Sequence, residues 1–114
     1  MSIKDLKVKT TKLNLGSREF EIAFDFNAIA ELDEVYGDFE DAMKAISGGK
    51  GRLKAIRALI YSMIKPRYED ITLLEVGEML STIMNGKEEA TKIMDQVKAA
   101  IEEGMPKNEE TEGE

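Results

Sequence analysis

The chain has 114 residues, enough for one compact domain, and its 23 acidic against 16 basic side chains give a formal charge of −7. It contains no Cys and no His, which excludes disulfides, thiolate catalysis, zinc-finger ligation and proton transfer by histidine. No apolar run has the length of a signal-peptide core or a membrane span, so a soluble, cytoplasmic protein is expected.

The charges are segregated along the sequence. Residues 19–41 contain nine acids and no base, whereas residues 44–67 contain seven bases and no acid. Such blocks can pair within the fold, between copies or with partners, and they steer encounters more than they set affinity. Two oppositely charged, solvated faces are the simplest expectation.

The first predicted element is an antiparallel β-hairpin over residues 6–26. Apolar and polar residues alternate on both sides of Gly16-Ser17, which is typical of two strands joined by a tight turn. Because two strands alone are only marginally stable, the apolar face must be covered by helices. In the second strand this face is formed by Phe20, Ile22, Phe24 and Phe26.

Helical periodicity replaces the alternation at residue 27. Asn27 is the predicted N-cap of a first helix that Gly37 ends, and Asp38 caps a short second helix. Residues 48–51 (GGKG) form a loop, and a third helix then ends before Pro66. Its expected apolar stripe contains Leu53, Ile56, Leu59, Ile60, Met63 and Ile64.

The fourth helix has the clearest start signal in the sequence. Thr72 and Glu75 form a T-x-x-E capping box, and Ile71 is placed to pack against Val76 across it. A fifth helix follows over residues 87–103. The predicted fold is therefore α+β: one domain over 1–104, with a hairpin (6–26) followed by a bundle of four to five helices (27–104). An acidic, disordered tail is expected over 105–114.

No predicted element carries a reactive centre. The carboxylate pairs Glu31/Glu34 and Asp38/Asp41 could serve acid–base catalysis or bind a cation, but solvent keeps exposed helical acids ionised. Residues 48–51 lack the first Gly and the Ser/Thr of a P-loop, and no His can activate a serine. The sequence therefore predicts no enzyme, no cofactor and no metal site.

Nucleic-acid binding is a less favoured interpretation of the basic block than a solvated face. Lys54 and Arg57 lie on the polar side of the predicted third helix and could contact phosphates. The pI near 4.8 and the adjacent acidic block argue against this. No nucleic-acid partner is expected, and a small DNA-associated regulator is the least favoured alternative.

The order of segments resembles a known family. IAFDF at 22–26 leads directly into NAIAELDEVYG at 27–37, FEDA follows at 39–42, and DITLLEVGEML spans 70–80. This is similar to tail assembly chaperones of long-tailed bacteriophages and small tail proteins of gene transfer agents. There, an F-x-x-x-A-I-x-E-L-E-x-x-x-G type segment follows a strand, and an I/L-T-x-E-E-V-G-x-x-L type segment follows the middle helix. The resemblance covers roughly residues 20–84, and Leu74 stands where an acid is common.

The resemblance implies a non-catalytic protein of the host cytoplasm that is absent from the mature virion. It would bind the phage tape measure protein and help recruit tail tube subunits, and in many phages a longer frameshifted form is also made. The alternative is a structural tail or connector subunit that forms homo-oligomers through its opposite charge blocks.

A chaperone for helical clients needs an adaptable apolar surface, and methionine repacks more easily than other side chains. The predicted patch lies on the last two helices. The competing interpretation is that the same residues complete the core. The residues are Met79, Met84, Ile93, Met94, Val97 and Ile101.

Overall fold

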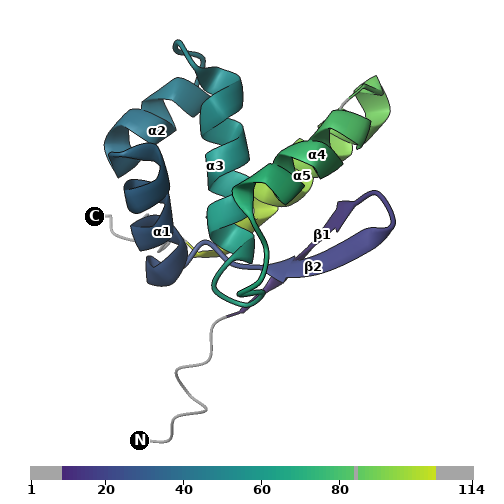
Figure 1. The fold of residues 1–114 in the computed structure, drawn as a ribbon, viewed down its shortest axis with the longest axis horizontal. Coiled ribbons are helices and arrows are strands. Elements are labelled where there is room, and N and C mark those ends of the chain that lie inside the picture. The colour runs from purple at the N-terminus through teal and green to yellow at the C-terminus, as the bar shows by residue number, and fades with distance from the viewer. Residues whose placement is uncertain (1–8, 84, 105–114) are drawn as a thin grey trace, which may run out of the picture.

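Two paired strands precede five helices in the computed structural model, which describes residues 9–83 and 85–104 (Figure 1). The α+β class predicted from the sequence is confirmed. Residues 6–8 of the predicted hairpin and the predicted tail over 105–114 lie outside the described residues. The elements are β1 (Thr11–Leu15), β2 (Arg18–Ile22), α1 (Phe26–Tyr36), α2 (Phe39–Ile46), α3 (Arg52–Ile64), α4 (Leu73–Ile83) and α5 (Lys87–Gly104).

The hairpin has the predicted turn and a single buried face. β1 and β2 are antiparallel, with Leu13 opposite Phe20, and Gly16 adopts the positive φ that the two-residue turn requires. Leu13 and Leu15 in β1 and Phe20 and Ile22 in β2 are buried, whereas Asn14 and Glu21, which lie between the buried residues of each strand, are exposed. This alternation is what the period of two predicted.

The second strand ends earlier than predicted, and the first helix begins earlier. Asp25, not Asn27, is the N-cap of α1, because its Oδ1 accepts a hydrogen bond from the Ala28 N–H at 3.1 Å. Phe26 consequently becomes the first residue of α1, and the alternation that would have placed its ring in the core stops at β2. The Phe26 side chain is 80% exposed.

The other predicted caps are confirmed. Asp38 caps α2 by accepting from the Glu40 N–H, and Gly37 ends α1 in the left-handed conformation. At α4, the Thr72 N–H donates to Glu75 Oε1 at 3.0 Å, and the Glu75 N–H donates to Thr72 Oγ1 at 3.1 Å. These reciprocal bonds are those of a capping box.

The core forms around α3, which contacts α1, α2, α4 and β2. Eight of its thirteen residues are buried, so most of its circumference is covered. Leu53 is the exception to the predicted stripe: it lies in the first turn, beyond the core, and is 74% exposed. In Figure 1, α1 and α2 lie on one side of α3, and the hairpin lies beneath α4 and α5.

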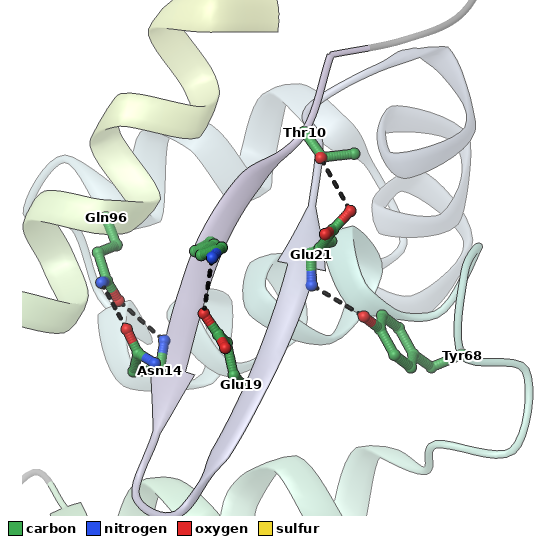
Figure 2. A network of polar contacts seen from close by, with 7 residues as sticks. Thr10, Asn14, Glu19, Glu21, Tyr68 and Gln96 are labelled. Carbon is green, nitrogen blue, oxygen red and sulfur yellow. Dashed lines mark hydrogen bonds and ion pairs between the residues drawn. The ribbon is translucent and has the colours of Figure 1, made fainter.

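Polar contacts fix the outer side of the hairpin (Figure 2). The Asn14 N–H donates to Gln96 Oε1 at 2.9 Å, and Gln96 Nε2 donates to Asn14 Oδ1 at 3.0 Å, which joins β1 to α5. The Tyr68 hydroxyl accepts from the Glu21 N–H at 2.9 Å, and its ring meets Phe20 edge-on. These contacts connect segments that are 47 and 82 residues apart in the sequence.

Candidate partner-binding groove

The structure divides the predicted apolar patch between core and surface. Ile93 and Val97 are each 2% exposed and belong to the core, because they share the face of α5 that packs on the hairpin. They cannot contact a partner directly, and for these two residues the core interpretation is correct. Met79, Met94 and Ile101 are partly buried, whereas Met84 lies outside the described residues.

Large apolar side chains are exposed elsewhere, at positions that the sequence analysis did not assign to a surface. Leu53 in the first turn of α3 and Leu74 in the first turn of α4 are 74% and 69% exposed. Phe26 is the third, at the start of α1. When a partner covers a leucine exposed to this degree, the removal of apolar surface from water stabilises the complex.

Leu53 borders a hollow between α3 and α4. The hollow has a volume of about 520 Å³ and is lined mainly by apolar atoms. Ile56 and Leu80, both nearly buried, form its floor. The complete lining is Leu53, Lys54, Ile56, Arg57, Gly77, Leu80 and Ser81.

A second hollow of about 290 Å³ lies between α3 and α5, and it shares Leu53 and Ile56 with the first. We call the two together the α3 groove. Figure 1 shows the geometry: the N-terminal half of α3 diverges from α4 and α5. Among the described residues of the predicted patch, Met94 is the one that lines it. The α5 side is lined by Arg52, Ala90, Thr91, Met94 and Asp95.

Arg57 lies against α4 at Gly77. A Cβ atom at position 77 would come within 3.3 Å of Arg57 Cδ, so the absent side chain of Gly77 leaves the space in which the arginine stem lies. The Nε atom of Arg57 is buried and has no hydrogen-bond partner among the described residues. A buried guanidinium donor without an acceptor is unfavourable, because the hydrogen bond that it made to water in the unfolded chain is not replaced.

The rim of the groove is basic. On the α4 side its charged residues are Lys54 and Arg57, with no acid, and Asp95 is the acid on the α5 side. Among the described residues, no ion pair reaches Lys54 or Arg57. The ion pairs that the described part of the chain does contain are Lys9–Glu103, Lys12–Glu19 and Arg67–Asp25.

Several of the side chains considered for catalysis make structural hydrogen bonds instead. Ser62 and Ser81 donate to backbone carbonyls one turn earlier in α3 and α4, and Ser47, the C-cap of α2, donates to the Met43 carbonyl. Asp38 is occupied as a helix cap. Over residues 9–83 and 85–104, no three His, Cys, Asp or Glu side chains gather as a metal site, and no helix has the length and apolarity of a membrane span.

One sequence feature points to the groove, but it also fits a core residue. Leu53 falls in register with the buried stripe of α3 yet stands between Arg52 and Lys54, and charged neighbours on both sides are typical of a helix end at the surface. Which of its neighbours complete the groove depends on how α4 and α5 pack on α3. Comparisons with protein-family models, curated protein sequences and solved structures found no match to this chain.

Proposed function

We propose that the protein is a non-catalytic tail assembly chaperone of a long-tailed bacteriophage. It acts in the host cytoplasm, binds the tape measure protein, helps recruit tail tube subunits, and is absent from the mature virion. The observation that carries this proposal is the α3 groove: an apolar hollow between helices with an exposed leucine at its rim.

The shape of the groove favours a polypeptide over a small molecule. It is open to solvent, and its polar lining residues are spread over three helices rather than gathered as a convergent set: Arg52, Lys54, Arg57, Ser81, Thr91 and Asp95. An amphipathic helix laid into an apolar groove is a common mode of peptide recognition. Met94 adds a side chain that repacks for different clients.

The family resemblance and the groove meet at α4. The segment ITLLEVGEML at 71–80 carries the Val-Gly and final Leu of the I/L-T-x-E-E-V-G-x-x-L pattern. Two of these positions, Gly77 and Leu80, line the α3 groove. Val76 lies in the core instead, where it holds α4 in place. The resembling segment thus contributes two residues to the surface proposed for binding.

Co-expression with the tape measure protein of the same genome tests the proposal. The wild-type chain should hold that protein in the soluble fraction and co-purify with it. Leu53→Asp places a charge at the rim of the groove and should abolish co-purification, whereas Phe26→Asp, an equally exposed site outside the groove, should leave it unchanged. Co-purification that survives Leu53→Asp would refute the assignment of the groove.

A second candidate function is a self-assembling structural tail subunit. Among the described residues, Arg67–Asp25 is the one ion pair that joins the acidic and basic blocks of the sequence, so most of these charges remain available to another copy. Purified particles separate the candidates, because a structural subunit is retained in them and a chaperone is not.

A further inference from the structure

We infer that the α3 groove selects an amphipathic helix that carries acidic side chains beside its aliphatic stripe, with one carboxylate bound to Arg57. The inference rests on the proposed function and extends it by naming the chemistry of the partner segment. Three features of the groove support it: the spacing of its apolar residues, its two basic residues that form no ion pair with the described part of the chain, and the position of Gly77.

The apolar residues of the groove match one face of a helix. Leu53 and Ile56 are three residues apart on α3, and Leu80 faces them from α4. Leu53 is exposed, whereas Ile56 and Leu80 lie in the floor, so the surface has a raised edge and a hollow beside it. Aliphatic side chains spaced by one helical turn on a partner would fill that hollow.

The charges beside this floor determine whether the partner segment should carry acidic or basic side chains. Lys54 and Arg57 are three residues apart and therefore lie on the same side of α3, next to the apolar floor. Neither forms an ion pair within the described part of the chain. Acidic residues flanking an aliphatic stripe would meet both bases, and basic residues there would be repelled.

Gly77 determines where the guanidinium lies. Because position 77 has no Cβ, the Arg57 stem lies against α4 at the edge of the hollow instead of extending into solvent. Arg57 therefore lines the hollow on its α4 side. A partner carboxylate would form charge-assisted hydrogen bonds with this preplaced guanidinium, which loses less side-chain entropy than a free one.

The test uses two synthetic helical peptides with the same leucine stripe, one flanked by glutamates and the other by lysines. Fluorescence anisotropy with the full chain should show the acidic peptide binding at least about tenfold tighter than the basic one. Arg57→Glu should weaken the acidic peptide by about tenfold or more and strengthen the basic one. Lys54→Glu, at an exposed position, repeats the reversal if Arg57→Glu impairs folding.

Lys12→Glu is the matched control, since it makes the same change in net charge on the hairpin, away from the groove. It should change both affinities by less than about twofold, because it alters only an exposed ion pair. Equal affinity for the two peptides, or equal effects of Arg57→Glu and Lys12→Glu, would overturn the inference. So would tighter binding of duplex DNA than of the acidic peptide.

Other occupants give different results. Loss of self-association in Arg57→Glu, measured by sedimentation, would assign the groove to a second copy. A preference for the acidic peptide that appears only after removal of residues 105–114 would assign it to that acidic segment. Either result overturns the inference.

If Leu53→Asp abolishes tape measure binding while peptide charge has no effect, the proposed function stands and the inference alone fails. If the acidic peptide is preferred but the tape measure protein does not bind, the groove chemistry stands and the proposed function fails.

Discussion

Met94 and Val97 are nearly one turn apart on α5 but have different environments. Val97 is buried with Ile93 in the core, whereas Met94 is partly exposed and lines the α3 groove. Both residues fit the same apolar stripe in the sequence. The pattern predicts the stripe, but the width of the surface that covers it decides which residue remains accessible.

Val97→Asp and Met94→Asp separate the two environments. Val97→Asp places a carboxylate in the core without a counter-ion and should lower the free energy of unfolding by about 3–5 kcal/mol. Met94→Asp should cost about 1 kcal/mol, because its side chain is already in contact with solvent. Chemical denaturation followed by circular dichroism measures both, and equal losses would contradict this assignment.

The exposure of Leu53 and Phe26 differs from what the periodic patterns of the sequence predict. Each stands in the first turn of a helix, where the chain enters from a loop and the core does not extend along its full length. Their patterns predicted burial, and both side chains are exposed. Sequence periodicity describes the middle of an element better than its ends.

At the scale of elements, local signals predicted most of the boundaries. The capping box before α4, the Asp38 cap of α2 and the Gly37 stop of α1 are all formed by side chains or backbone within a few residues. Local chemistry of this kind is readable in a sequence. The start of α1 was wrong because Asp25 and Asn27 are both good N-caps, and only the backbone geometry distinguishes them.

Alanine substitutions test which of the two residues caps α1. Asp25→Ala removes the acceptor for the Ala28 N–H and the ion-pair partner of Arg67, and should lower the free energy of unfolding by about 1–2 kcal/mol. Asn27→Ala lies at an exposed position inside the helix and should change stability by less than about 0.5 kcal/mol. Urea denaturation of both variants measures the difference, and a larger loss in Asn27→Ala would restore the sequence-based assignment.

The capping box gives a local prediction for α4. Thr72→Ala removes the acceptor for the Glu75 N–H and should cost about 1 kcal/mol. The loss should be concentrated in the first turn of α4, where amide hydrogen exchange should accelerate more than in α3. Uniform acceleration across both helices would show that the capping box supports the whole fold instead.

For the molecule as a whole, the arrangement of the elements depends on contacts between distant parts of the chain. α5 packs on β1, and the Asn14–Gln96 hydrogen bonds link these two segments across 82 residues. Periodicity predicted that helices must cover the hairpin, but it does not specify which ones. The α3 groove also depends on packing between distant segments, because its walls come from α3, α4 and α5. Local sequence patterns predict each of these helices separately.

A chain ending at Gly86 tests the role of α5. Without α5, the buried side chains of β1 lose most of their cover, and a two-stranded sheet has little stability of its own. The truncated chain should lose cooperative thermal unfolding and amide NMR dispersion. Retention of a cooperative transition would show that α1–α4 and the hairpin form a stable unit without α5.

The central claim is that the α3 groove binds a protein partner. Methyl-detected NMR of the full chain, titrated with the tape measure protein or its fragments, tests it residue by residue. We expect the methyl signals of Leu53, Ile56, Leu80 and Met94 to shift together and saturate, while those of Leu13 and Ile22 on the buried face of the hairpin stay in place. Shifts confined to residues around Phe26, or the absence of shifts in the groove on binding, would contradict it.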